Sequence, residues 1–110
     1  MSNPETDKIH ILTVDDHQLS REGIASMLAG QEDMKLVAQV ASGPEAIEAY
    51  RDLRPDVTLM DLRMPGMSGI EAITTIRAEF PNARIIVLTT YAGDVQAAAA
   101  LKAGAAGYLL

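Results

Sequence analysis

The chain has 110 residues, of which 48% are hydrophobic and 22% charged, so it can form one compact domain with a buried core but not two. Nine Lys and Arg residues against fifteen Asp and Glu residues give a net charge of −6, which argues against direct binding of nucleic acid or of an anionic membrane. The sequence has no cysteine, which excludes disulfides, thiolate metal sites and cysteine nucleophiles. We expect a cytoplasmic location with no membrane contact, because no apolar run approaches the roughly 20 residues of a membrane span and no signal peptide precedes the domain.

Five short hydrophobic runs rich in β-branched residues are spaced along the chain. They are nearly continuous rather than alternating with polar residues, which is typical of parallel strands buried on both faces. We expect each run to form a strand of one sheet. The runs cover residues 9–14, 36–40, 57–60, 85–88 and 108–110.

Four segments with helical periodicity separate these strand candidates. Ser42 with Glu45, and Ser68 with Glu71, have the spacing of capping boxes at the starts of the second and third helices. The fourth helix is rich in alanine, which favours helix formation but offers little area for packing. Each helix is followed by a residue that can end it: 19–28 by Gly30, 47–53 by Pro55, 70–80 by Pro81, and 94–103 by Gly104.

The alternation of strands and helices predicts an α/β fold, a doubly wound parallel sheet with helices on both faces. We expect residues 1–8 to be a flexible tail and residues 9–110 to be one domain. The chain stops within the fifth strand candidate, so we expect part of one sheet face to lie bare. Exposed apolar strand surface of this kind predicts a homodimer or a domain-swapped oligomer.

Oxygen-bearing side chains stand where three of the predicted strands end. Asp15 and Asp16 follow the first strand, Asp61 the third and Thr89 the fourth. Ligands of open parallel sheets bind beyond the carboxyl ends of the strands, so we expect these side chains to converge. Neighbouring carboxylates raise one another's pKa unless a cation lies among them. Oxygen ligands favour Mg²⁺, which can attract and orient a phosphoryl group.

Four segments follow the predicted strands or end the chain: VDDH at 14–17, MDLRMPGMSG at 60–69, LTT at 88–90 and KAGAAGYLL at 102–110. With these segments in this order, the sequence resembles the receiver domain of two-component response regulators, from about residue 8 to residue 110. Asp-Asp-His followed by Arg-Glu-Gly at 21–23 is similar to the subfamily joined to a helix-turn-helix DNA-binding domain of the LuxR type. The resemblance implies a flavodoxin-like sheet of five strands in the order 2-1-3-4-5.

The resemblance implies a role for each site residue. Asp61 would accept a phosphoryl group from a phosphohistidine of a sensor histidine kinase. Asp15, Asp16, Asp61 and the backbone carbonyl of Arg63 would hold Mg²⁺. Thr89 would donate its hydroxyl to the new phosphate, and Tyr108 would be the switch aromatic that turns inward. The protein would then be a signalling module rather than an enzyme, with self-catalysed phosphotransfer and slow autodephosphorylation at most.

The chain departs from the family pattern at its end. The family has a lysine directly after a segment like 108–110, and then a fifth helix, and neither is present here. We therefore expect a truncated receiver that lacks a DNA-binding output domain for transcription regulation. DNA would be reached only through that missing domain.

Some residues allow a second interpretation. Thr90 could replace Thr89 as the switch hydroxyl, although adjacent strand residues face opposite ways and we favour Thr89. His17 stands beside two aspartates, but with no second histidine nearby we expect a surface or capping role rather than metal ligation. Tyr108 could be an ordinary core residue, and His10 lies within a strand and is expected to be structural.

Two other functions use the same fold. A phosphohydrolase of the haloacid-dehalogenase type also has an aspartate after a parallel strand, but it needs a second aspartate two residues later, where this chain has Arg63. A flavin- or nucleotide-binding module would need a glycine- or hydroxyl-rich loop after the first strand. That strand ends instead in two acidic residues, which repel phosphate in the absence of a metal.

Overall fold

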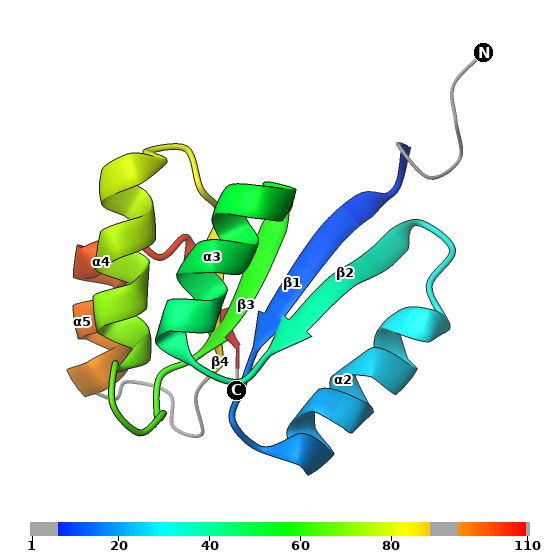
Figure 1. Cartoon of the computed structure of the whole chain (residues 1–110), viewed down its shortest axis with the longest axis horizontal. Coiled ribbons are helices and arrows are strands. Elements are labelled where there is room, and N and C mark those ends of the chain that lie inside the picture. The colour runs from blue at the N-terminus through cyan, green and yellow to red at the C-terminus, as the bar shows by residue number, and fades with distance from the viewer. Residues whose placement is uncertain (1–6, 89–94, 110) are drawn as a thin grey trace.

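A computed structural model describes residues 7–88 and 95–109 (Figure 1). Strands and helices alternate along the chain in this part, which confirms the predicted α/β fold. The strands are β1 (Ile9–Val14), β2 (Met34–Val40), β3 (Val57–Asp61), β4 (Ile85–Leu88) and β5 (Gly107–Leu109). The helices are α2 (Gln18–Ala29), α3 (Gly43–Leu53), α4 (Gly69–Glu79) and α5 (Val95–Ala103).

The strands form one parallel sheet in the order β2-β1-β3-β4-β5, as the flavodoxin-like prediction requires. Because β1 lies between β2 and β3, the strand order reverses next to it. Val14 pairs with Met60, so β1 and β3 end side by side. Residues that directly follow these two strands are therefore brought together at one edge of the sheet.

The helix ends follow the predicted signals, with one difference. Ser68 forms a complete capping box with Glu71 at the start of α4. At the start of α3, the Ser42 hydroxyl accepts the Glu45 backbone N–H at 3.3 Å. The Glu45 carboxylate accepts from the Ser42 hydroxyl and not from the Ser42 backbone N–H, so this predicted capping box is incomplete. Gly104, directly after α5, has a φ of +118°, a backbone conformation that glycine adopts without strain.

The main core lies between the sheet and the layer formed by α3, α4 and α5, which Figure 1 shows on the opposite side of the sheet from α2. Alternate strand residues point toward this layer and are fully buried. They pack against apolar residues of α3 and α4, together with Ala100 of α5. The largest buried apolar side chains of this core are Leu12, Val14, Met60, Ile73, Ile76, Ile85 and Val87.

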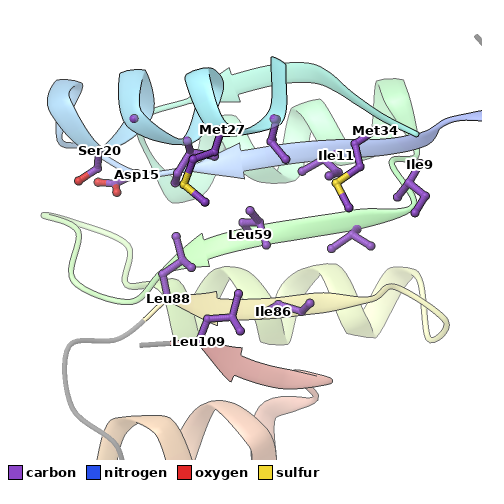
Figure 2. A pocket seen from close by; sticks show the side chains of 14 residues that line it. Ile9, Ile11, Asp15, Ser20, Met27, Met34, Leu59, Ile86, Leu88 and Leu109 are labelled. Atoms are coloured by element: carbon purple, nitrogen blue, oxygen red, sulfur yellow. The ribbon is translucent and has the colours of Figure 1, made fainter. Parts of the chain in front are cut away.

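The other face of the sheet is open over part of its width. The helix α2 contains no buried residue, and Leu19 and Met27 are 83% and 73% exposed. Between α2 and the sheet lies an apolar groove of about 960 Å³, shown in Figure 2. This confirms the expectation that part of one face is bare. Strands β1, β3, β4 and β5 contribute Ile9, Ile11, Val57, Leu59, Ile86, Leu88 and Leu109 to the groove.

Two further observations concern membrane-spanning helices and the N-terminal residues. None of the described helices combines the length and the apolar character that a membrane span requires. The predicted flexible tail at residues 1–8 falls mostly on residues outside the described part of the chain, which begins at residue 7.

Candidate functional site

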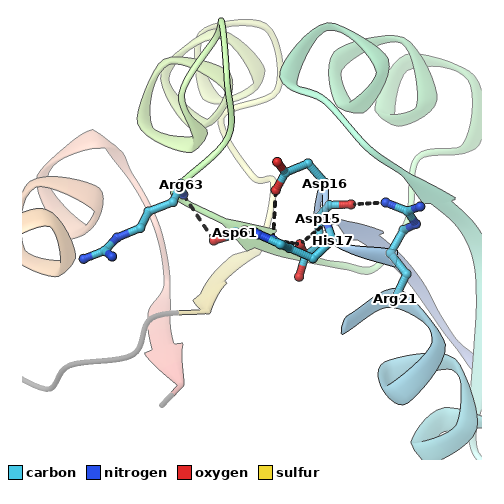
Figure 3. A network of polar contacts seen from close by, with 6 residues as sticks. All are labelled: Asp15, Asp16, His17, Arg21, Asp61 and Arg63. Atoms are coloured by element: carbon cyan, nitrogen blue, oxygen red, sulfur yellow. Dashed lines mark hydrogen bonds and ion pairs between the residues drawn. The ribbon is translucent and has the colours of Figure 1, made fainter. Parts of the chain in front are cut away.

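Three aspartates meet at the edge of the sheet where β1 and β3 end (Figure 3). Asp15 and Asp16 directly follow β1, and Asp61 is the last residue of β3. One carboxylate oxygen from each aspartate and one ring nitrogen of His17 all lie within 4.8 Å of one another. The structure therefore brings together the three carboxylates that the sequence predicted to converge.

Asp15 is the most deeply buried of the three, and hydrogen bonds hold its turn in place. Its backbone N–H donates to the Val40 carbonyl at 3.0 Å. Its Oδ1 accepts the backbone N–H of His17 at 2.8 Å, and its own carbonyl oxygen accepts Nη1 of Arg21 at 2.7 Å. Gln39 of β2 in turn donates to the Arg21 carbonyl at 2.7 Å. The position of this carboxylate is thus set by both α2 and β2.

Asp16 carries the clearest sign of a missing partner. Its Oδ1 is buried and accepts no hydrogen bond of acceptable geometry among the described residues. Nδ1 of His17 lies 3.0 Å from this oxygen, and the imidazole is a cationic partner only when it is protonated. A buried carboxylate oxygen without a hydrogen bond is costly unless a cation satisfies it.

Asp61 is partly buried beside the other two acids. Burial raises the pKa of the Asp61 carboxyl, and the charges of Asp15 and Asp16 raise it further. The backbone N–H of Arg63, which donates to Oδ1 at 3.1 Å, acts in the opposite direction. The site therefore disfavours its full negative charge when no cation is bound.

His17 behaves differently from the sequence prediction. It is the N-cap residue of α2, but its side chain makes no capping hydrogen bond. Its Nδ1 lies 3.1 Å from Asp15 Oδ1, 3.0 Å from Asp16 Oδ1 and 3.8 Å from Asp61 Oδ2. The hydrogen bond to Asp15 and the charge of Asp16 raise the pKa of His17. The side chain is 66% exposed, which confirms the first of the two expected roles, a surface position, and not the second, a capping bond.

The loop behind Asp61 is held by the start of α4. Gly69 donates its backbone N–H to the Leu62 carbonyl at 3.2 Å, and it leaves no room for a side chain against the Asp61 carbonyl. The capping box of Ser68 and Glu71 satisfies backbone N–H groups of the same turn. The side chain of Arg63 is exposed and extends away from the aspartates (Figure 3), so only its backbone is available to the site.

One of the two predicted switch residues lies outside the part of the chain that the structure describes, and the other lies away from this cluster. Thr89 and Thr90 lie outside the described residues. Tyr108 is in β5, paired with Val87 of β4, so β4 separates it from the strand that carries Asp61. It is 39% exposed, which argues against the alternative that it is an ordinary core residue.

Arg21 is a site residue that the sequence prediction assigned only to a subfamily motif. Its guanidinium reaches back across the first turn of α2 to the Asp15 carbonyl. The sequence signal for this contact was the position of Arg21, four residues after the N-cap residue His17. This spacing places Arg21 on the face of α2 that points toward the end of β1. Such spacing does not indicate that the partner of Arg21 is a backbone carbonyl.

The residues present fit a divalent cation. The three carboxylates supply the oxygen ligands that Mg²⁺ prefers, and the orphaned oxygen of Asp16 would gain a partner. The described residues thus form an acidic cluster that could hold a metal ion.

The sequence profile of the response regulator receiver domain family matches residues 11–110. The response regulator protein VraR of Staphylococcus aureus strain Mu3 is 43% identical over 102 residues, covering 93% of this chain and 49% of the relative. VraR of Staphylococcus epidermidis is 42% identical with the same coverage. The chain spans about half the length of the curated relatives it matches.

Solved structures agree with this assignment. A LuxR-family two-component response regulator from Aurantimonas sp. has a TM-score of 0.87 and 40% identity, covering 92% of this chain and 72% of that one. The signal receiver domain of the putative response regulator NarL from Mycobacterium tuberculosis has a TM-score of 0.88 and 33% identity, with 94% and 84% coverage. The isolated receiver domain of RcsB from Salmonella enterica, determined in the presence of the phosphomimetic BeF₃⁻, has a TM-score of 0.83 and 29% identity, with 94% and 77% coverage. The chain therefore belongs to the response regulator receiver domain family and is a signalling module of a two-component system.

Proposed function

We propose that Asp61 is the phosphoacceptor of this receiver domain and that a sensor histidine kinase is the donor. The observation that carries this proposal is the meeting of Asp15, Asp16 and Asp61 at the end of two adjacent strands. Asp61 stands at the centre of the sheet edge and is less buried than Asp15. The Arg63 N–H on Oδ1 orients its carboxylate and leaves Oδ2 without a hydrogen bond to the backbone of this turn.

The proposed reaction is a direct phosphoryl transfer. An oxygen of the ionised Asp61 carboxylate attacks phosphorus, an O–P bond forms, and the P–N bond to the donor imidazole breaks. The released imidazole takes a proton from solvent, and the product is an acyl phosphate on Asp61. Arg21 and the His17 backbone keep Asp15 in place during this step, because they bond to its carbonyl and its carboxylate.

We assign the ligands of Mg²⁺ to Asp15, Asp16, Asp61 and the backbone carbonyl of Arg63. When bound, the ion would neutralise the charge that gathers on the phosphoryl oxygens. The support for this assignment is the donor set and the buried Asp16 oxygen that accepts no hydrogen bond.

The response to phosphorylation is proposed to involve Thr89 and Tyr108. Thr89 would bond the new phosphate, and Tyr108 would turn from its half-exposed position toward the interior, changing the surface of α5 and β5. In the whole protein this change would control a DNA-binding domain outside the present chain and so regulate transcription. The LuxR-family relative supports that output class.

The two alternative functions are not favoured. A haloacid-dehalogenase-type hydrolase needs an acid at position 63, and the residue there is an exposed arginine. A nucleotide or flavin site needs a phosphate-binding loop after β1, and that position holds Asp15 and Asp16. The family assignment points the same way.

Phosphotransfer can be tested directly on Asp61. The protein is incubated with Mg²⁺ and a small acyl-phosphate donor, and a covalent adduct is detected by intact mass. We expect the adduct in the wild type and in Asp52→Asn, a control that changes an exposed acid at the end of α3. We expect no adduct in Asp61→Asn. An adduct that persists in Asp61→Asn would overturn the assignment.

Self-association and location complete the proposal. The apolar groove and the exposed Leu109 and Ile9 support a homodimer or a domain-swapped oligomer. Light scattering that gives a clean monomer at high concentration would contradict it. A cytoplasmic location is proposed because the kinase-dependent reaction needs a donor in the same compartment.

A further inference from the structure

The imidazole of His17 lies where a ligand of the acidic site would stand. One atom, Nδ1, is 3.0 Å from Asp16 Oδ1, 3.1 Å from Asp15 Oδ1 and 3.8 Å from Asp61 Oδ2. Adjacent ligands of an ion with octahedral bonds of about 2.1 Å are about 3 Å apart. The ring nitrogen thus has the spacing of a neighbouring ligand to two carboxylates at once.

The backbone holds His17 in this position independently of its ring. Its N–H donates to Asp15 Oδ1 at 2.8 Å, and its carbonyl accepts the N–H of Arg21 at 3.1 Å as the first helical bond of α2. The side chain is 66% exposed, so its position costs little desolvation. A side chain anchored in this way can contribute to a metal site without any rearrangement of the turn.

From this geometry we propose that the His17 imidazole is a nitrogen ligand of the metal site, the fourth side-chain ligand beside the three aspartates, and that it shifts the preference of the site from Mg²⁺ toward imidazole-binding divalent ions such as Co²⁺, Ni²⁺ and Zn²⁺. Carboxylate and carbonyl oxygens suit Mg²⁺, whereas imidazole suits the later first-row ions. A site with three carboxylates alone would lack this bias. The inference rests on the proposed function, because it concerns the same three aspartates.

The experiment measures the binding of Co²⁺ and of Mg²⁺ by titration calorimetry. We expect His17→Ala to weaken Co²⁺ binding by about tenfold or more while changing Mg²⁺ binding by less than about threefold. His17→Asn should do the same, and it preserves folding because asparagine is a favourable N-cap residue. The matched control is His10→Ala, which removes the other histidine of the chain and should leave both affinities unchanged.

A spectroscopic measurement tests the bond itself. Pulsed electron paramagnetic resonance of bound Mn²⁺ should show modulation from a ¹⁴N nucleus in the wild type and in His10→Ala, and none in His17→Ala. Absence of this modulation in the wild type, or Co²⁺ affinity that is unchanged or higher in His17→Ala, would overturn the proposal. Either result would show that the imidazole lies beside the carboxylates without binding the ion and moves away when the ion binds.

The aspartate variants separate this inference from the proposed function. If Asp16→Asn and Asp61→Asn both leave Mg²⁺ and Co²⁺ binding intact, the metal site itself is refuted. If they abolish binding while the histidine variants change neither affinity, the proposed function stands and only the role of His17 is refuted.

Discussion

A Cβ atom placed on Gly69 would stand 2.5 Å from the carbonyl oxygen of Asp61 and 2.8 Å from Cα of Leu62. Both neighbours are backbone atoms, so neither can move aside as a flexible side chain would. The first residue of α4 therefore packs directly behind the strand end that carries the proposed phosphoacceptor. Position 69 needs glycine because of this close approach rather than because of its backbone angles.

Gly69→Ala is expected to destabilise the fold by about 1–3 kcal/mol, because the added methyl group forces the backbone apart. Urea unfolding measures the change, and amide shifts of Asp61 and Leu62 report the displacement. The control is Gly23→Ala in α2, where nothing lies within 4 Å of the new methyl group. That variant is expected to be more stable by about 0.5–1 kcal/mol, since alanine favours helix over glycine. Equal effects at the two positions would contradict the steric argument.

Thr58→Val is expected to stabilise the protein. Thr58 is fully buried in β3, and its hydroxyl has no hydrogen-bond partner in the part of the chain that the structure describes. Valine has nearly the same shape and removes the unsatisfied hydroxyl, which should raise the free energy of unfolding by about 1 kcal/mol. Thr58→Ser keeps the hydroxyl and removes a buried methyl group, so it should lower stability by about 1 kcal/mol. A valine variant less stable than the wild type would show that the hydroxyl has a partner in solution.

The sheet could be predicted from the sequence because its signal is local. Parallel strands buried on both faces need continuous apolar runs, and few other structures in a short acidic chain require such runs. The run at 85–88 coincides with β4, and the run at 36–40 is extended by only two residues in β2. Strand order came from the family resemblance, since no local pattern encodes which strands are neighbours.

The packing of α2 could not be predicted in the same way. Its apolar residues recur at helical spacing, and a helix does form there, yet none of its residues is buried. Periodicity shows which residues share a face of a helix, whereas burial depends on what lies against that face. Here Gly23, Ile24, Met27 and Leu28 line the open groove instead.

The acidic site was predictable to the level of its aspartates. Strand ends in a parallel sheet share one edge, which is enough to group Asp15, Asp16 and Asp61. The position of the His17 ring depends on a side-chain rotamer, and the Arg21 bond depends on a backbone carbonyl. Neither contact has a signature in residue spacing.

The ion pair between Arg51 of α3 and Glu79 of α4 predicts a pH dependence of stability. Arg51 Nη2 lies 2.6 Å from Glu79 Oε2, and Nε donates to Oε1 at 3.0 Å. This bond lowers the pKa of Glu79 below its ordinary value of 4.5. A carboxyl with a lower pKa in the folded state contributes stability above its unfolded pKa and loses that contribution as the pH falls through its folded pKa.

Glu79→Gln is therefore expected to be less stable than the wild type at pH 7, and the difference should shrink as the pH falls below 4.5 and vanish once the Glu79 carboxyl is protonated in the folded protein. Urea unfolding across this range measures it. The effect should shrink in 1 M salt, because both side chains are partly exposed. Glu32→Gln, an exposed acid between α2 and β2, is the control. A difference that persists at low pH would mean that Glu79 acts through packing and not through its charge.

Asp61→Asn is expected to raise the melting temperature of the protein in the absence of divalent ions. Burial and the charges of Asp15 and Asp16 raise the pKa of Asp61, so the folded state binds its proton more tightly than the unfolded state does. The ionised carboxylate thus lowers stability at neutral pH, and the neutral amide removes this cost.

Magnesium should reverse the order of the two proteins. In the wild type the ion would offset the repulsion among the three carboxylates, so the melting temperature should rise with Mg²⁺ concentration through linkage between binding and folding. The Asp61→Asn variant has lost one proposed ligand and should respond much less. Thermal unfolding with and without Mg²⁺ measures both effects, with Glu32→Gln as the matched control that keeps the full response. If Asp61→Asn were less stable than the wild type without metal, the prediction that repulsion among the three carboxylates destabilises the protein would be wrong. The Asp61 carboxylate would then be stabilised by attraction, most directly to Nδ1 of His17 at 3.8 Å.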